Sequence, residues 1–120
     1  MLLKVLRAKL HRATVTQAEV DYVGSITIDK DLLDASGILP YEDVLVADLN
    51  NAQRFHTYVI EGPAGSGVIC VNGAAAKLVS VGDRIIVMAF AFAEPAEARA
   101  IAPAIILVDG NNRVAQRLSQ

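Results

Sequence analysis

The chain has 120 residues, of which 53% are hydrophobic and 20% charged, which predicts one domain spanning residues 1–120. Its net charge of −2 argues against a nucleic-acid partner, and no apolar run approaches the ~18 residues that span a membrane. Cys70 is the only cysteine, which excludes an internal disulfide and a cysteine pair for zinc, and a reducing cytoplasm is the expected location.

Short apolar runs separated by turn signals predict a chain built mainly of strands. The runs cover residues 2–10, 13–16, 26–28, 44–49, 54–60, 68–71, 84–92 and 104–108. A short helix is expected after Asp29 or Asp31, ending at Gly37, and a brief Ala-rich turn at residues 73–78. Residues 110–120 read as a polar tail. Many short strands with few helices indicate a small barrel or sandwich.

The dipeptide Gly24-Ser25 admits three interpretations. An ordinary turn is the commonest use of such a pair, and a second one stands at Gly65-Ser66. A hydrolase nucleophile is a weak interpretation, because no GxSxG motif surrounds the serine. The third interpretation is a serine that attacks the carbonyl group before it. That reaction needs a strained loop, which Gly24 tolerates because it has no Cβ, and donors that stabilise the developing oxyanion.

The segment "RFHTYVI", residues 54–60, is a predicted strand with two distinct faces. Arg54, His56 and Tyr58 share one face, and Thr57 points to the other. An arginine and a tyrosine on one face can bind a carboxylate and pass a proton. For this segment alone, an exposed strand face without chemistry is the simpler interpretation.

Two further segments combine a structural explanation with a chemical one. "KLHR" places Lys9 and His11 on one face of a strand, which alone indicates a solvated edge more readily than a site. In "VNGAAAKL", Gly73 exposes backbone N–H groups that can hold an anion, although for this segment alone an ordinary turn into a short helix is the simpler interpretation. The spacing of a phosphate loop is absent, and no grouping of histidines with carboxylates indicates a metal.

Taken together, six ordered segments of the chain resemble the pyruvoyl-dependent aspartate 1-decarboxylases. They are "KLHRATVT" (9–16), "YVGS" (22–25), "ASGIL" (35–39), "NNAQRFHTYVI" (50–60), "VNGAAA" (71–76) and "SVGD" (80–83). Their order and spacing cover nearly the whole chain. The resemblance implies a mainly β fold, a small six-stranded double-psi β-barrel with short helices. It also implies a homotetramer with active sites between neighbouring subunits.

The resemblance further implies that the precursor cleaves itself between Gly24 and Ser25, giving a β chain of residues 1–24 and an α chain of residues 25–120. Ser25 would become a covalent pyruvoyl group, and neither a metal nor pyridoxal phosphate would be needed. The pyruvoyl ketone would form an imine with L-aspartate and accept electrons as carbon dioxide leaves. The product, β-alanine, would supply pantothenate biosynthesis. Maturation is either autonomous or assisted by a maturation factor.

The family pattern assigns roles to the matching positions of this chain. Lys9 and Arg54 would hold the substrate carboxylates, and Tyr58 would return a proton after decarboxylation. Thr57 would form a hydrogen bond near Gly24 during cleavage and line the substrate pocket. Further substrate contacts would come from Asn72, Gly73, Ala74 and Ala75, with Tyr22 and His11 in support.

The resemblance leaves two difficulties and one alternative. Thr57 and Tyr58 are adjacent, so both serve one region only if the strand bends or neighbouring subunits contribute. Ala52 stands where relatives commonly have glycine, which bears on the conformation of a turn. The alternative function is a non-catalytic or unprocessed β-barrel module, a scaffold or binding protein, which composition alone favours.

Overall fold

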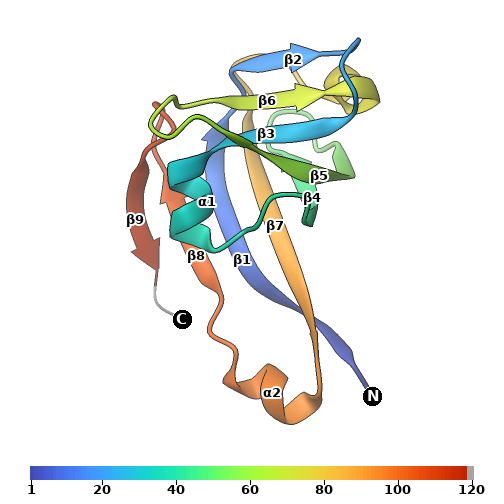
Figure 1. The fold of residues 1–120 in the computed structure, drawn as a ribbon, viewed down its shortest axis with the longest axis vertical. Helices are drawn as coiled ribbons and strands as arrows, with labels where there is room; N and C mark the ends of the chain where they lie inside the picture. Colours follow the sequence, from blue (N-terminus) through green and yellow to red (C-terminus); the bar gives the residue numbers. More distant parts are fainter. Residues whose placement is uncertain (119–120) are drawn as a thin grey trace.

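The structure, a computed structural model, describes residues 1–118 and consists mainly of short strands (Figure 1). The strands are β1 (Leu3–Thr14), β2 (Gln17–Glu19), β3 (Ser25–Asp29), β4 (Asp43–Asp48), β5 (Arg54–Gly62), β6 (Ile69–Asn72), β7 (Arg84–Ala93), β8 (Ala104–Val108) and β9 (Val114–Leu118). The helices are α1 (Lys30–Ser36), the 3-10 helix η1 (Gly73–Leu78) and α2 (Pro95–Ala100). Each predicted strand is present, with the two runs at residues 2–10 and 13–16 joined into β1.

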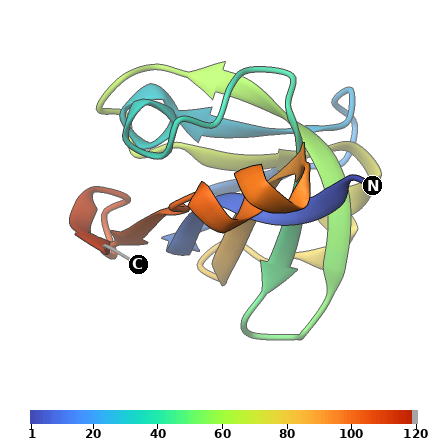
Figure 2. The ribbon, with the colours of Figure 1, turned by 90° about the horizontal axis from the view of Figure 1, so that it is seen from below.

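The strands form one mixed sheet, in the order β2-β6-β3-β5-β4-β7-β1-β8-β9. The pairs β1–β8, β2–β6 and β3–β5 are parallel, and the other neighbours are antiparallel. Seen along its length, the sheet curls around its own centre (Figure 2). The expectation of a mainly β fold is confirmed, and the mixed pairing agrees with a double-psi β-barrel. Residues 1–118 contain more strands than the six expected, because short strands such as β2 and β9 extend the edges of the sheet.

Strand alternation separates an aliphatic core from an outer face. In β1 a register shift at Arg12, whose φ is 72°, breaks the simple alternation. Leu10 and Ala13 therefore both face the core although they are three positions apart in the printed sequence, while Lys9 and His11 face outward. The largest fully buried side chains are all aliphatic: Leu10, Ile26, Ile28, Leu32, Ile38, Ile69, Ile85 and Ile106.

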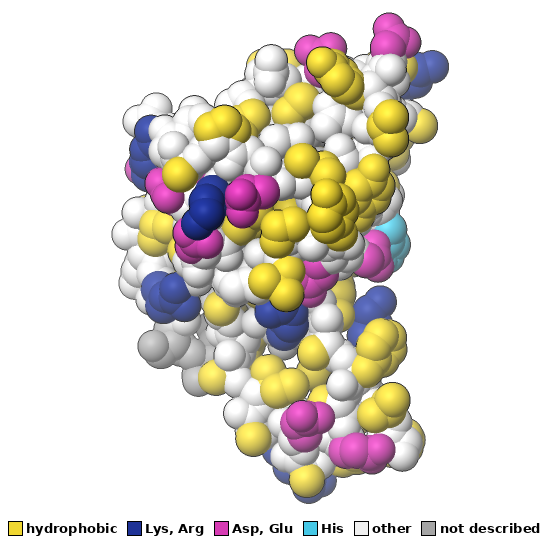
Figure 3. Space-filling model, in the orientation of Figure 1, with side chains coloured by type: hydrophobic (Ala, Val, Ile, Leu, Met, Phe, Trp, Pro, Cys, Tyr) yellow, Lys and Arg dark blue, Asp and Glu magenta, His cyan; other side chains and the backbone are white. Residues whose placement is uncertain are grey.

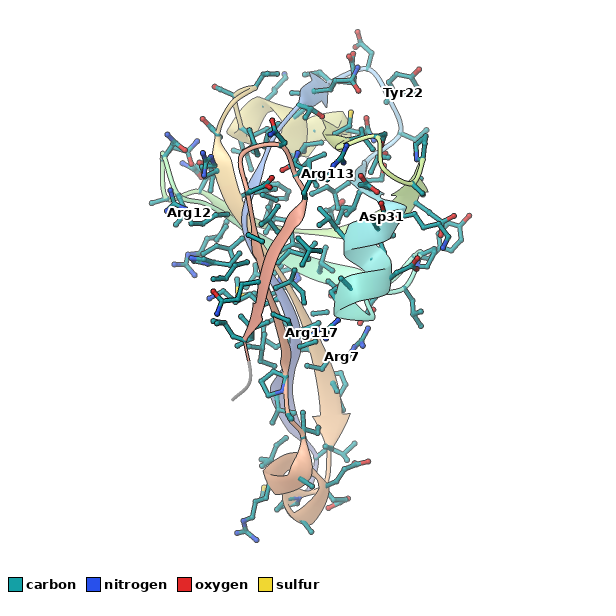
Figure 4. The ribbon with its side chains drawn as sticks, turned by 90° about the vertical axis from the view of Figure 1, so that its left-hand side faces the viewer. Arg7, Arg12, Tyr22, Asp31, Arg113 and Arg117 are labelled. Carbon is teal, nitrogen blue, oxygen red and sulfur yellow. The ribbon has the colours of Figure 1, made fainter. Side chains whose placement is uncertain are left out.

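Helix α1 has the predicted boundaries. Asp29 caps its N-terminus by accepting a hydrogen bond from the backbone N–H two residues later at 2.8 Å. Gly37 ends it in the left-handed conformation, with φ of 77°. Arg7 donates to the carbonyl of Gly37 at 3.1 Å and Arg117 donates to that of Ala35, so two cations lie at the C-terminal end of the helix (Figure 4).

Polar segments account for the differences from the sequence-based expectation. The prediction of a tail is wrong for residues 110–118, because β9 pairs with β8 and Asn112 is buried. The Asn112 amide donates to the carbonyls of Thr14 at 2.9 Å and Gly67 at 2.8 Å, long-range contacts that no local pattern shows. Residues 119 and 120 of the predicted tail lie outside the described residues. Over residues 1–118, every helix falls short of the length and hydropathy needed to cross a bilayer.

Candidate active site

A pocket of about 470 Å³ opens on the outer face of β5, β3, β6 and β2, and Ser25 is part of its wall. This volume falls in the range of small-molecule sites. Paired residues of neighbouring strands point to the same face, so the register arranges the lining side chains in two rows. One row is Tyr58, Ser25, Asn72 and Glu19, and the other is Ile60, Thr27, Cys70 and Gln17.

Ser25 begins β3 and is buried, with 4% of its surface exposed. Nδ2 of Asn72, on the paired strand β6, donates to Oγ of Ser25 at 2.9 Å and to Oγ1 of Thr27 at 3.3 Å. An N–H donor at this position stabilises negative charge on the serine oxygen. The structure therefore brings two of the sequence-predicted site residues, Ser25 and Asn72, into direct contact.

Gly73 packs against Gly24, the residue before the serine. Its φ is +77°, and a Cβ placed on it would lie 2.6 Å from Cα of Gly24 and 2.9 Å from its nitrogen. Only glycine fits there without displacing Gly24. Gly24 itself has no left-handed φ, and a Cβ on it would meet only the Asn72 carbonyl oxygen, at 3.9 Å. The unusual backbone that the sequence predicts at Gly24 is thus found at Gly73.

Both predicted tyrosines line the pocket. Tyr58 lies on β5 with 36% of its surface exposed. Tyr22 lies in the exposed turn that leads into β3 (Figure 4). The phenol of Tyr58 is therefore within reach of a small molecule held beside Ser25.

Lys9 and Arg54 share the outer face of the sheet but do not line the pocket. Lys9 is on β1, four strands from β3 in the sheet order. Strand pairing sets out two rows across β5, β4, β7, β1 and β8: His56, Leu45, Met88, Lys9 and Ile105 in one, and Arg54, Ala47, Ile86, His11 and Leu107 in the other. We call these ten residues the cation face. Within one chain, the two predicted carboxylate-binding residues are not brought to Ser25.

His11 lies on the cation face beside Lys9. Its Nδ1 is buried and has no hydrogen-bond partner among the described residues. Burial lowers the pKa of His11, and the positive charges of Lys9 and Arg12 lower it further. Both effects favour the neutral imidazole, and the supporting role of His11 stays a prediction.

Thr57 points to the opposite side of β5 from Tyr58 and does not line the pocket. It is paired with Val44, which is buried in the core, and the β4–β5 register has no shift that would turn it outward. Ala74 and Ala75 follow Gly73 in η1, and neither lines the pocket. The roles predicted for Thr57 and these two alanines stay predictions.

Four polar residues of the pocket were not predicted as site residues: Gln17, Glu19, Thr27 and Cys70. Thr27 and Cys70 stand two positions from Ser25 and Asn72, so the period of a strand was a usable signal. No comparable signal marks Glu19, because β2 has only three residues. The pairing of β2 with β6 is what brings Glu19 beside Asn72. Across residues 1–118, no three histidine, cysteine or acidic side chains gather closely enough to hold a metal ion.

Comparisons with known proteins agree with the segments that carry the resemblance. The family described as aspartate decarboxylase matches residues 1–115. Aspartate 1-decarboxylase of Lactiplantibacillus plantarum is 58% identical, over 98% of this chain and 91% of the relative. Aspartate 1-decarboxylase of Phenylobacterium zucineum is 56% identical, over 95% and 97%. The crystal structure of the rationally designed mkDPBB_sym_86 protein covers 64% of this chain and 90% of its own, with a TM-score of 0.48 and 22% identity. The matches over nearly the full length place this chain in the aspartate decarboxylase family.

Proposed function

We propose that this chain decarboxylates L-aspartate to β-alanine and carbon dioxide, with a pyruvoyl group that it makes from its own Ser25. Family membership supports the reaction, since the relatives over nearly the full length are aspartate 1-decarboxylases. The observation that carries the proposal is the placement of Ser25. It is buried in the wall of a pocket, directly after Gly24, and its oxygen accepts a hydrogen bond from the side-chain amide of Asn72. The product would feed pantothenate biosynthesis.

The surroundings of Ser25 fit the formation of a pyruvoyl group. Attack of the serine oxygen on the Gly24 carbonyl carbon forms an ester, breaks the Gly24–Ser25 C–N bond and passes the hydroxyl proton to the freed amine. Loss of the Ser25 α-proton then releases Gly24 as a carboxylate, and water converts the remaining dehydroalanine to a ketone and ammonia. The N–H of Asn72 supports charge on the oxygen that attacks and later leaves. The absence of a side chain on Gly73 leaves room for Gly24.

The mature group would supply an electron sink for the charge left when carbon dioxide departs. The chain's own residues would bind the substrate and move protons. Tyr58 is the proton donor that we assign, because its phenol lines the pocket beside Ser25. Pyridoxal phosphate and metal ions have no role in this proposal.

We also propose a homotetramer in which each active site combines two subunits. Lys9 and Arg54 lie outside the pocket of their own chain, yet the substrate has two carboxylates to bind. The cation face that carries them is lined by aliphatic side chains that are mostly half-buried in a single chain. Hydrophobic side chains also gather over the region of β4 and β5 (Figure 3). Covering this face with a neighbouring subunit would bring the cations to that subunit's Ser25.

Intact-mass spectrometry tests the cleavage. The wild-type chain, incubated after purification, should divide into residues 1–24 and a 25–120 fragment that begins with a ketone. Ser25→Ala should remain uncleaved and inactive, whereas Ser66→Ala, its matched control in the second Gly-Ser pair, should cleave and turn over normally. A wild-type chain that is active with an unmodified serine at position 25 contradicts the proposal. Cleavage only after addition of a cell extract would indicate a maturation factor.

Co-expression of variants tests the shared site. Ser25→Ala and Arg54→Ala chains should each be nearly inactive alone. In mixed tetramers, up to about one quarter of the sites combine an intact Ser25 with an intact Arg54 by random assortment, and activity should return. Mixing Ser25→Ala with Tyr58→Phe is the control, because both changes fall in the same pocket and no combination repairs it. Equal recovery in both mixtures, or in neither, contradicts the shared site.

We propose a cytoplasmic location for the enzyme. Cys70 is the only cysteine of the chain and its thiol is free, which fits a reducing compartment. Fractionation of cells that produce the protein checks this location.

A further inference from the structure

The amide of Asn72 lies at the centre of a chain of hydrogen bonds in the pocket wall. Its Nδ2 donates to Oγ of Ser25 at 2.9 Å and to Oγ1 of Thr27 at 3.3 Å. Its Oδ1 accepts from Sγ of Cys70 at 3.2 Å. Cys70 and Asn72 have only 6% and 9% of their surfaces exposed, so bulk water competes little for these groups.

The two hydroxyl groups do not determine which way the amide points. A hydroxyl both donates and accepts, so Ser25 and Thr27 could bond either end of the Asn72 side chain. The thiol is a weak donor and a weak acceptor, and in the structure it donates to the amide oxygen of Asn72, which is a stronger acceptor than a neutral sulfur would be for the NH2 group. Cys70 therefore favours the orientation in which the oxygen of Asn72 faces the sulfur and its NH2 group faces Ser25.

The thiol stays protonated where this contact needs it. Burial raises the pKa of Cys70, and the negative charge of Glu19 on the adjacent strand β2 raises it further. At neutral pH the sulfur thus carries the proton that it donates to Asn72.

Resting on the proposed self-cleavage, we propose that Cys70 is a positioning residue for the reaction at Gly24-Ser25. Its thiol holds the Asn72 amide with the NH2 group toward the serine oxygen. The side chain of Cys70 neither attacks the peptide bond nor changes covalently.

The orientation of the amide decides what the serine can do. With NH2 toward Oγ, the oxygen accepts a hydrogen bond, its own proton is free to leave, and charge on it is stabilised during attack on Gly24. With the amide reversed, the Ser25 hydroxyl would donate to the Asn72 oxygen. Its proton would then be held by a group that is too weak a base to remove it, and the developing charge would lose its donor.

The rate of cleavage of the purified precursor, followed by intact mass, tests this role. Cys70→Ala removes the donor and should slow cleavage roughly fivefold, the effect of one lost orienting hydrogen bond. Cys70→Ser supplies a hydroxyl that can donate to the Asn72 oxygen but can also accept from its NH2 group, so it should restore only part of the rate. Thermal unfolding is measured in parallel, and Cys70→Val replaces the alanine variant if the latter does not fold.

Each outcome bears on the inference separately from the proposed function. Slow cleavage in Cys70→Ala with partial recovery in Cys70→Ser supports the positioning role. Wild-type rates in the alanine and valine variants overturn it, and so do serine and alanine variants that are equally slow, since packing rather than donation would then explain the loss. A wild-type chain that never cleaves counts against the proposed function instead, and it withdraws the basis of this inference.

Discussion

The chain carries the dipeptide Gly-Ser twice, in surroundings that differ in every respect. Ser25 is buried at the start of β3, and its oxygen accepts a hydrogen bond from Asn72 at 2.9 Å. Ser66 is exposed in the turn between β5 and β6, and its hydroxyl donates to the carbonyl of Pro63 at 2.7 Å. The proton of Ser66 is thus engaged in a local turn, whereas the oxygen of Ser25 is held by a donor from another strand.

The glycines differ as well. Gly65 has a φ of +74°, and a Cβ placed on it would make only an ordinary contact, with Oδ2 of Asp31 at 3.8 Å, so it is a turn residue with room for a small side chain. Gly24 fills the space that a side chain on Gly73 would occupy. The dipeptide alone therefore does not specify the proposed cleavage site. Packing from β6 and η1, distant in the sequence, distinguishes the first pair from the second.

The largest expected effect is a loss of turnover without a loss of cleavage, caused by a change in the pocket that contains the first Gly-Ser pair. Tyr58 lines the pocket that contains Ser25, and Tyr58→Phe keeps the ring but removes the proton. We expect normal cleavage and a fall of about 10²–10⁴-fold in β-alanine formation, the usual contribution of a positioned acid. Intact mass reports the first quantity and product release the second.

Tyr41→Phe is the matched control for this prediction, because Tyr41 is 76% exposed and does not line the pocket. It should cleave and turn over like the wild type. Wild-type turnover in Tyr58→Phe would show that the proton comes from another group, and a loss of cleavage would show that Tyr58 acts in maturation.

A smaller effect should distinguish the glycines around the two pairs. Gly73 and Gly65 have nearly the same φ, +77° and +74°, so alanine imposes a similar backbone strain at both, about 1–2 kcal/mol. Only at Gly73 does the new Cβ collide with Gly24. Gly73→Ala should therefore slow cleavage at least about tenfold, because it displaces the reacting carbonyl.

Gly65→Ala should lower the unfolding temperature through the same backbone strain, without the collision, and should cleave at the wild-type rate. Time courses by intact mass and thermal unfolding of both variants measure the two quantities. Equal cleavage rates in the two alanine variants would show that the approach of Gly73 to Gly24 has no part in the reaction.

The same contrast between local and long-range contacts determines how much of the fold could be predicted from the sequence. Local signals were sufficient for α1, because Asp29 and Gly37 are a cap and a stop that act within one turn. Apolar runs were sufficient for the central strands. The edge strands β2 and β9 are short or polar, and their pairing partners lie elsewhere in the chain. No local pattern therefore indicates them.

The residues of the candidate site divide in the same way, into those that a sequence motif indicates and those that only strand pairing brings to the pocket. The resemblance to a family supplied Ser25, Asn72 and Tyr58, and the pairing of β3 with β5 and β6 brings them together. Cys70 and Glu19 have no motif of their own and enter the pocket only through pairing across β2, β6 and β3. Lys9 and Arg54 were supplied by the same resemblance, but within one chain they lie outside the pocket that contains Ser25.

The smallest effect on cleavage is expected at Asp29, which ends the strand that Ser25 begins and binds the loop of the second Gly-Ser pair. Its Oδ1 accepts from the N–H of Gly65 at 3.0 Å, and its Oδ2 from that of Gly67 at 2.8 Å. Asp29→Asn keeps the shape but turns an NH2 group toward an N–H donor. We expect a loss of roughly 2 kcal/mol in the free energy of unfolding at pH 7, the cost of an unsatisfied buried donor. Cleavage at Gly24-Ser25 should continue.

Acid should remove most of this difference. Burial alone would raise the pKa of Asp29, but backbone N–H groups, with Arg113 adding a positive charge, outweigh it, so the folded pKa lies below the ordinary 3.8. A depressed carboxylate pKa contributes stability that is fully present above the unfolded value and is lost as the pH falls through the folded value. Urea unfolding of both proteins at pH 7 and at steps below pH 4 should therefore show the wild type losing its advantage. If the difference in free energy of unfolding between the wild type and Asp29→Asn stays constant down to the lowest pH, the charge of the carboxylate does not hold the Gly65–Gly67 loop. The shape of the side chain alone would then stabilise this turn.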